Sequence, residues 1–397
     1  MHDIRDAIHG NISLTDLEVK LLDTPQVQRL RNIRQLGFAY LVYPGANHTR
    51  FEHSLGVCHL AGRLASNLEL PKTKIKLLRV AGLLHDLGHG PFSHTSERML
   101  KRFLKKGHEE IAKELIMKSE LKSILNRAGI SPKKIVGLFA GNEKYSELLH
   151  SELDVDRMDY LVRDSYYTGV AYGLIDLERL LATIKLHRGK PVLTGGVQAA
   201  ESLLRARFLM YPSVYEHHTN RIAESMFVRA LESALLNKHI QPKDLYLMDD
   251  VKVISALRNS KGYSKEIFAR IENRNLFKRA LEINKKQAGQ PLTEYLLGIR
   301  KQPDEISKLE KEICETAKID EGYAILDIPD PLYCQRELEL SLKQGDELVK
   351  ASDASTSIRT LEDAQWDYWK TMVFCPDEKR KQVEKAARKV LNLGKSQ

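Results

Sequence analysis

Cysteine is scarce in this sequence, and long apolar runs are missing. The cysteines are scattered, with no Cys-x-x-Cys pair, and they stand at Cys58, Cys314, Cys334 and Cys375. This spacing predicts no disulfide framework and is typical of a protein from the reducing cytoplasm. No stretch reaches the roughly 18 uncharged apolar residues that a membrane span needs, and residues 1–5 contain no apolar segment that would indicate a secretory signal. We therefore expect a cytoplasmic protein with no membrane partner.

Acidic residues are fewer than basic ones. Lys and Arg number 62 against 53 Asp and Glu, which gives a net charge of +9. An excess of this size fits a polyanionic partner, whether a nucleotide, a nucleic acid or an anionic surface, but does not choose among them. The basic residues cluster only near the C-terminus, between Lys379 and Lys389. We interpret that run as the solvated face of a helix, with a nucleic-acid-binding surface as the alternative.

Apolar residues recur at helical spacing through the first 240 residues, which predicts a mainly α-helical core. A change of composition at Gln241-Pro242 predicts a boundary between this core (1–240) and a smaller α+β lobe (241–397). In the core we expect a short extended segment at 40–43 and helices at about 25–36, 51–69, 73–88, 93–106, 108–118, 153–167, 176–187 and 197–237. In the lobe we expect strands at 323–328 and 366–373.

Histidine is unevenly distributed, since six of the 14 histidines fall between positions 48 and 94. His85 and Asp86 follow an apolar segment, and burying both without partners would be costly. His53 stands 32 residues before His85, and Asp156 stands 70 residues after Asp86. Two imidazoles and two carboxylates from three helices suit a divalent cation with open coordination positions, and Mn, Fe, Co, Ni or Mg fits them better than a thiolate-bound zinc does.

This pattern resembles the HD superfamily of metal-dependent phosphohydrolases. Longer blocks resemble its deoxynucleoside triphosphate (dNTP) triphosphohydrolase branch, and together they cover about residues 5–235. These blocks are DTPQ (23–26), RLR (29–31), QLG (35–37), FEHSLGV (51–57), HDLGHGPFSH (85–94), DVDRMDY (154–160) and YPSVYEH (211–217). The resemblance implies a helical HD-domain core and implies that the catalytic metal ion is ligated by His53, His85, Asp86 and Asp156.

A second group of residues follows the break at Gly90-Pro91, where we expect a new helix to begin. His94 and Glu97 are then neighbours on one helix face. A carboxylate beside a histidine favours the imidazolium, which suits a general acid that protonates a leaving oxygen. From the residues alone this could equally be a surface ion pair. The resemblance implies that the catalytic group consists of His94, Glu97 and His108.

A third group is suited to holding a nucleoside. Asp156, Tyr160 and Asp164 lie four residues apart, along one helix face. The resemblance implies that Tyr160 lies against the sugar where a 2′-hydroxyl would clash, and that Asp164 accepts from the 3′-hydroxyl. Further substrate contacts that the resemblance implies are Gln35, Arg50, His89, Arg157 and Tyr215. Without it, both tyrosines would more often be half-buried core residues.

The resemblance also implies an effector site, because Asp23, Gln28 and Arg31 match positions that recognise a guanine activator in the family. The alternative is structural, with Asp23 capping the following helix and Arg31 paired to a neighbour. The expected function is metal-dependent hydrolysis of dNTPs to deoxynucleoside and triphosphate. The family implies a homo-oligomer and a nucleotide effector (GTP or a dNTP). The alternatives are another HD phosphohydrolase, acting on a nucleoside monophosphate or a phosphodiester, and a nucleic-acid-binding protein on the same fold.

Overall fold

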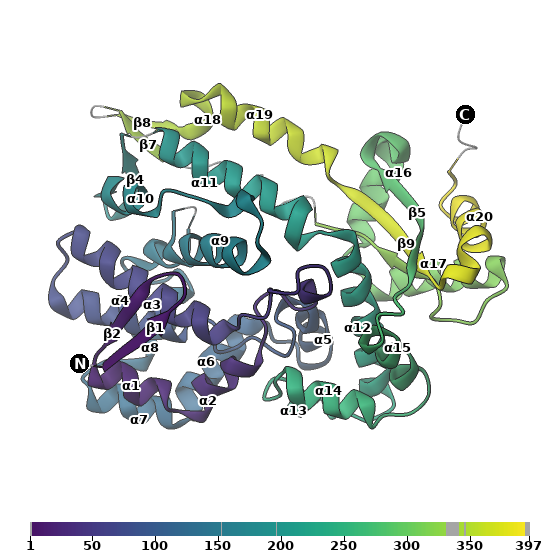
Figure 1. Cartoon of the computed structure of the whole chain (residues 1–397), viewed down its shortest axis with the longest axis horizontal. Helices are drawn as coiled ribbons and strands as arrows, with labels where there is room; N and C mark the ends of the chain where they lie inside the picture. Colours follow the sequence, from purple (N-terminus) through teal and green to yellow (C-terminus); the bar gives the residue numbers. More distant parts are fainter. Residues whose placement is uncertain (1, 152, 196, 331–340, 345–346, 394–397) are drawn as a thin grey trace.

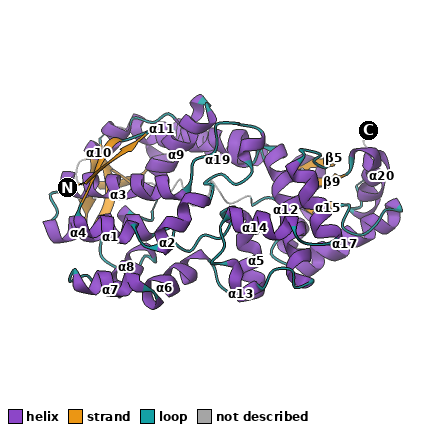
Figure 2. Cartoon of the chain, turned by 60° about the horizontal axis from the view of Figure 1, so that its bottom comes forward, coloured by secondary structure: helices purple, strands orange, loops and turns teal. Residues whose placement is uncertain are grey.

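The computed structural model describes residues 2–151, 153–195, 197–330, 341–344 and 347–393 (Figure 1). Helices make up most of the described chain, and the strands gather in small sheets (Figure 2). This confirms the expected fold class, a mainly α-helical HD-type core with a smaller α+β lobe.

The helical core forms around α3 (Arg50–Asn67), which packs against α4 (Lys72–Leu84) and α9 (Val155–Thr168). Nearly the whole length of α3 is buried, because small residues such as Gly56 and Ala61 let neighbouring helices approach. The other helices up to residue 236 are α1 (Asp16–Leu22), α2 (Pro25–Gln28), α5 (His94–Leu104), α6 (His108–Lys118), α7 (Glu120–Arg127), α8 (Pro132–Phe139), α10 (Leu177–Thr183), α11 (Val197–Met210) and α12 (His218–Leu236).

The C-terminal lobe contains an antiparallel sheet with β9 (Lys370–Cys375) between β5 (Lys278–Asn284) and β6 (Ile325–Asp327). A second hydrophobic core lies between this sheet and three helices, namely α16 (Lys285–Ile299), α17 (Pro303–Ala317) and α20 (Arg380–Val390). The preceding helices join the first core instead, because their apolar residues pack with α12 or α5. These are α13 (Pro242–Leu245), α14 (Asp250–Arg258) and α15 (Gly262–Glu272).

Two further sheets belong to the larger part of the chain. β1 (His2–Asp6) and β2 (Gly10–Leu14) form an antiparallel N-terminal hairpin. The second sheet has the order β3-β4-β7-β8, with only the β4–β7 pair parallel. Its strands are β3 (Ile184–His187), β4 (Lys190–Thr194), β7 (Ser341–Gln344) and β8 (Glu347–Lys350), and after them α18 (Ala351–Ala354) and α19 (Thr356–Ala364) run along α11 (Figure 1).

The predicted helix over 25–36 is wrong, because α2 ends at Gln28 and a 3-10 helix (Arg29–Asn32) follows. The reason lies in tertiary contacts. The Arg29 side chain is buried, and its guanidinium donates to the carbonyl oxygens of Leu87 and His89 at 2.7 and 2.9 Å. Such long-range bonds override a local helical pattern.

The predicted helix over 176–187 stops early, since α10 ends at Thr183 and the chain continues into the β3–β4 hairpin. Arg188 and Gly189 connect these strands with positive φ angles of 53° and 86°. Two positive φ angles in a two-residue loop are the requirement of the tight hairpin turn that matches strand twist.

The predicted helix over 197–237 is divided into α11 and α12. A π-helical turn at Tyr211–Tyr215, which contains Pro212, separates the two helices. Proline removes a backbone donor and blocks the regular helical ladder. The turn directs Tyr215 toward α9, as described below.

The predicted strands have mixed outcomes. The strand at 323–328 is confirmed by β6, whereas the one at 366–373 begins late, because Gln365–Asp367 forms a 3-10 helix before β9. The segment 40–43 is not extended, since a 3-10 helix covers Ala39–Leu41. The N-terminal hairpin and the helices α7 and α8 were not predicted.

Three expectations concern side chains far from the core. Among the described residues, Cys58, Cys314 and Cys375 are buried free thiols, and Cys334 lies outside the described chain. The basic run falls on α20, whose apolar side packs inward while most of its basic residues face solvent, as expected for a solvated helix face. No helix within the described ranges is long and apolar enough to cross a membrane.

Candidate metal centre and its surroundings

Three elements of the core bring the predicted metal ligands together. His53 lies in the first turn of α3, and Asp156 lies in the first turn of α9. The predicted helix over 73–88 ends four residues early, at Leu84, so His85 and Asp86 stand in the turn that follows α4. A turn suits this role because it lets two adjacent side chains face the same point.

The ligand atoms converge from all four side chains. His53 Nε2 lies 2.8 Å from an Asp156 oxygen and 3.7 Å from an Asp86 oxygen. His85 Nε2 lies 3.2 Å from Asp86 Oδ1 and 3.7 Å from Asp156 Oδ1. His85 Nε2 is buried and makes no hydrogen bond to any described residue. A buried nitrogen left without a hydrogen bond is costly unless something binds it.

The opposite ring nitrogens fix the orientation of both imidazoles. His53 Nδ1 lies 2.8 Å from Asp159 Oδ2, and His85 Nδ1 donates to the Gly82 carbonyl oxygen at 2.7 Å. These contacts place the proton on Nδ1 and leave each Nε2 facing the centre, which is the usual arrangement of metal-binding histidines. The residues therefore fit a divalent cation with mixed nitrogen and oxygen ligands.

The charges of the site also favour binding of a cation. Burial lowers the pKa of His53, but hydrogen bonds to Asp156 and Asp159 outweigh it and raise the pKa to about 10. Burial raises the pKa of Asp156, but the neighbouring imidazoles of His53 and His85 outweigh it and hold that pKa well below its ordinary value. These carboxylates thus stabilise positive charge at this point, which a divalent ion would supply.

Arg50 joins the metal ligands to the segment before α5. Its Nη1 donates to Asp86 Oδ2 at 2.6 Å, and its Nε donates to Ser93 Oγ at 2.8 Å. The side chain is buried. Arg50 therefore orients the ligand Asp86 in addition to any contact with substrate.

Three imidazoles gather beside the centre. The rings of His89 and His108 stack with centroids 4.5 Å apart, and His94 meets His89 edge-on at 4.8 Å. Gly88 allows this arrangement, because a Cβ at that position would lie 1.8 Å from the His108 carbonyl oxygen. The structure thus brings together the three histidines that the sequence assigned to catalysis and phosphate contact.

Glu97 connects two of these histidines. Its Oε1 lies 3.1 Å from His108 Nδ1, and its Oε2 lies 3.4 Å from His94 Nδ1. Burial raises the pKa of Glu97, but the bonds to His108 and His94 outweigh it and hold the pKa far below its ordinary value. The ionised carboxylate can therefore orient both rings.

The imidazolium expected for His94 beside Glu97 stays a prediction, because opposing effects act on the pKa of this histidine. Desolvation by the surrounding walls, with the charge of Arg50, outweighs the bond to Glu97, so the pKa of His94 lies below its ordinary value. The His94 side chain is nevertheless 69% exposed, and it can be reached by a ligand.

The tyrosines predicted to hold the nucleoside contact each other, Tyr160 from α9 and Tyr215 from the turn after α11. The rings of Tyr160 and Tyr215 meet edge-on, 6.3 Å apart. The Tyr215 hydroxyl donates to Asp164 Oδ2 at 2.8 Å, and the other oxygen of Asp164 lies 2.8 Å from His48 Nε2. Asp164 is only 1% exposed, so in this structure it mainly holds Tyr215 and His48.

Other predicted substrate residues have different surroundings. The side-chain oxygen of Gln35 is buried and has no hydrogen-bond partner among the described residues. Arg157 donates to the Ser151 carbonyl oxygen.

Sequence reasoning missed Arg207, a buried arginine whose charge lowers the pKa of Tyr160 against the effect of burial. Its position on α11 gave no local signal, because it is an arginine within an ordinary amphipathic pattern.

The predicted effector residues lie near one another on the surface around α2. Asp23 is exposed and ends α1, and it does not cap α2. Arg31 Nε donates to Gln28 Oε1 at 2.9 Å, and its guanidinium lies over the Phe51 ring, 3.5 Å from the centroid. The structural role expected for Arg31 as a partner of a neighbour is therefore present.

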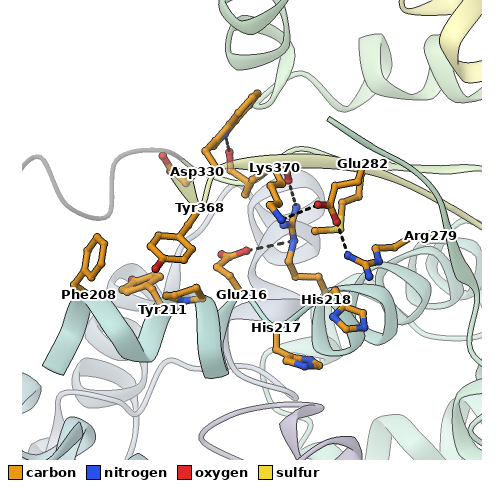
Figure 3. Close-up of a pocket in the computed structure, with 15 residues that line it drawn as sticks. Phe208, Tyr211, Glu216, His217, His218, Arg279, Glu282, Asp330, Tyr368 and Lys370 are labelled. Atoms are coloured by element: carbon orange, nitrogen blue, oxygen red, sulfur yellow. Dashed lines mark hydrogen bonds and ion pairs between the residues drawn. The ribbon is translucent and has the colours of Figure 1, made fainter. Parts of the chain in front are cut away.

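A separate pocket of about 330 Å³ opens between the end of α11, the start of α12 and the lobe strands β5 and β9 (Figure 3). Its charges are largely paired, with Glu216 at 3.3 Å from Arg221 and Lys370 at 2.7 Å from Glu282. The described residues that line it include none of the candidate site residues predicted from the sequence.

Comparison with known proteins fits this geometry. Residues 50–164 match the model of the HD domain, and residues 175–397 match that of the HD associated region. The chain belongs to the HD-domain family of metal-dependent phosphohydrolases. The matched HD domain contains the convergent ligands from α3, the turn after α4, and α9.

The matches to individual relatives extend over most of this chain. An uncharacterised protein of Methanocaldococcus jannaschii is 37% identical over 96% of this chain and 81% of its own length. The deoxynucleoside triphosphate triphosphohydrolase SAMHD1 homolog of Dictyostelium discoideum is 32% identical over 70% of this chain, and the match spans 60% of its own length. A solved phosphohydrolase from Bacteroides thetaiotaomicron is 25% identical with a TM-score of 0.74, over 95% of this chain and all of that chain.

Proposed function

We propose that the protein is a cytoplasmic, metal-dependent hydrolase that converts dNTPs to deoxynucleosides and triphosphate. The observation that carries the proposal is the convergence of four ligands, with an imidazole cluster beside Asp86 and a pair of tyrosines, of which Tyr160 lies on α9, the helix that also carries the ligand Asp156. A nucleoside triphosphate has the matching parts, namely a polyanion beside a flat, partly apolar nucleoside. The relatives named as dNTP triphosphohydrolases support this choice of substrate.

The proposed ligands are His53, His85, Asp86 and Asp156, and a bound divalent cation would supply Lewis-acid activation of water and offset the phosphate charge. The water oxygen bonds to the α-phosphorus while the bond from phosphorus to the 5′-oxygen breaks. His94 gives its proton to the departing 5′-oxygen, and the water oxygen leaves in the triphosphate. The attacking water releases one proton to solvent, and a proton from solvent restores the His94 imidazolium. The negative charge of the substrate raises the pKa of His94 toward the protonated form that this step needs.

The other residues hold the substrate for this step. Glu97 orients His94 and His108, whose rings face the phosphates together with His89 and Arg157. Stacked and edge-on aromatic rings are suited to the sugar and base. On this side we assign Gln35, Tyr160 and Tyr215, with Asp164 fixing the Tyr215 hydroxyl, while Arg50 orients Asp86.

Regulation by a nucleotide is part of the proposal. Asp23, Gln28 and Arg31 lie around α2 with an exposed carboxylate and an exposed guanidinium, which can read a guanine edge. We assign this surface to GTP or a dNTP in a homo-oligomer. Activation by a second nucleotide that is lost in Asp23→Ala, with basal turnover kept, tests this assignment.

The test is chromatography of the products after incubation with each dNTP and Mn²⁺ or Mg²⁺, with and without GTP. Deoxynucleoside with intact triphosphate is expected. His94→Ala and Asp156→Ala should fall to near background, because removing one member of a catalytic unit abolishes most activity. His239→Ala, an exposed histidine elsewhere, is the matched control and should keep full activity.

Two other outcomes would reject parts of the proposal. Diphosphate with monophosphate would keep a metal phosphohydrolase but refute the assigned leaving group. No turnover, together with salt-dependent binding of an oligonucleotide by a metal-ligand variant, would favour a nucleic-acid-binding protein instead.

A further inference from the structure

A buried chain of polar groups links the N-terminal hairpin to the metal ligand His53. Its centre is Asp159 on α9, whose Oδ2 lies 2.8 Å from His53 Nδ1 and accepts from Arg163 Nε at 2.8 Å. The other oxygen, Oδ1, lies 2.6 Å from His9 Nε2 and accepts from Arg163 Nη2 at 3.0 Å. Both oxygens of Asp159 thus have two donors each, which fixes the carboxylate in one orientation.

At the hairpin end of this chain of polar groups, both oxygens of Asp6 also accept hydrogen bonds. Asp6 Oδ2 accepts from Arg163 Nη1 at 2.8 Å. Asp6 Oδ1 accepts from the backbone amides of Ile8 and His9 at 2.9 and 2.8 Å. The same carboxylate therefore shapes the turn that carries His9 and anchors the arginine that holds Asp159.

The two charged residues at the centre of this chain of polar groups lie inside the protein core. The side chains of Asp159 and Arg163 are completely buried, and a buried charge is tolerated only when it is paired and hydrogen-bonded. Gly56 on α3 makes the space, because a Cβ there would lie 1.8 Å from Asp159 Oδ1 and 2.6 Å from Arg163 Nη2. Glycine inside a helix costs about 0.5–1 kcal/mol relative to alanine, so the close approach of Asp159 explains its presence.

We propose that His9 and Asp159 are positioning residues of the metal centre, and that the hairpin thereby sets the affinity for the divalent ion. Asp159 holds the Nδ1 proton of His53, keeping Nε2 aimed at the ion, and His9 holds Asp159. The inference rests on the proposed metal site but on no assumption about the substrate. Outer partners of metal ligands commonly change affinity by about 10–100-fold when removed.

The test is the dissociation constant for Mn²⁺, measured on the full chain without nucleotide by calorimetry and by the paramagnetic resonance of free Mn²⁺. His9→Phe keeps a ring of similar size and removes the donor to Asp159, and we expect affinity to fall by about 10–100-fold. The matched control is Leu14→Ala, which removes a buried apolar side chain from the same hairpin without touching the chain of polar groups. It should bind Mn²⁺ as the wild type does, although it lowers stability.

A second variant, Asp6→Asn, tests the proposal even if His9→Phe does not fold. Asp6→Asn keeps an oxygen for the amides of Ile8 and His9 and loses the charge that faces Arg163, so it should weaken Mn²⁺ binding to a smaller extent. Wild-type affinity in the folded His9→Phe or Asp6→Asn variant would overturn the proposal, as would equal weakening in Leu14→Ala. A wild type that binds no Mn²⁺ would overturn the metal site itself, whereas failure to hydrolyse dNTPs would refute only the proposed substrate.

Discussion

Replacing Asp250 with alanine should both destabilise the protein and slow its turnover. Asp250 lies at the start of α14, and its two oxygens accept from the backbone amides of Phe92 and Arg34 at 2.6 and 3.0 Å. Phe92 and Ser93 both have a φ of 54°, an unfavourable region for residues with side chains. Asp250 thus holds the strained segment that leads directly into His94.

The size of the effect follows from these bonds. A buried amide that loses its acceptor costs about 1–3 kcal/mol, so two such losses cost about 2–6 kcal/mol. Burial raises the pKa of Asp250 from 3.8 to about 6, above its unfolded value. The contribution of Asp250 to stability is therefore fully present at low pH and falls by up to about 3 kcal/mol as the pH rises through that window. We expect a loss of about 2 kcal/mol at pH 7 and a larger loss at pH 5.

Urea unfolding at both pH values measures the stability change, and steady-state kinetics with a dNTP measures the effect on His94. The control is Asp249→Ala, whose carboxylate caps α14 by accepting from Lys252 N at 2.9 Å. Losing that cap costs about 1 kcal/mol and should leave kcat unchanged. A wild-type kcat in Asp250→Ala, or an equal fall of kcat in Asp249→Ala, would refute the reasoning.

Two further predictions concern pH and substrate affinity. Burial, followed by the charges of Glu216 and Asp327, raises the pKa of Glu224 to about 8, above the unfolded value of 4.5. The folded protein holds this proton longer, so its stability falls as the pH rises from about 4.5 to 8. Glu224→Gln should reduce the change of the unfolding free energy between about pH 4.5 and 8. An unaltered pH dependence would contradict this prediction. Tyr215→Phe removes a hydrogen bond to the Asp164 carboxylate. This should lower the free energy of unfolding by about 1.5–3 kcal/mol and raise the KM for dNTP with a smaller change in kcat, because the Tyr215 ring loses the bond that fixes its orientation. An unchanged KM would argue against a substrate role for Tyr215.

The helices that carry the site could be predicted because their signals are local. The apolar spacing of 51–69, 108–118 and 153–167 predicts α3, α6 and α9, and the structure has all three. The four metal-ligand candidates converge because their motifs fall on these helices and on the turn after α4.

The parts that could not be predicted depend on distant partners. Arg29 is a charged residue in a core, which only its acceptors on other elements explain, and Arg163 also needs Asp6 of the distant N-terminal hairpin. His9 lies 150 positions from Asp159 in the sequence, in a short hairpin with little apolar alternation. The segment at 184–187 fits helical and strand periods alike, and its pairing with β4 decides between them.

Hydrolysis of a dNTP in ¹⁸O-labelled water is the most direct measurement of the central claim. Attack on the α-phosphorus with departure of the 5′-oxygen predicts one ¹⁸O atom in the triphosphate and none in the deoxynucleoside, as read by mass spectrometry. Label in inorganic phosphate or diphosphate, or in the deoxynucleoside, would contradict the proposed reaction at this metal centre.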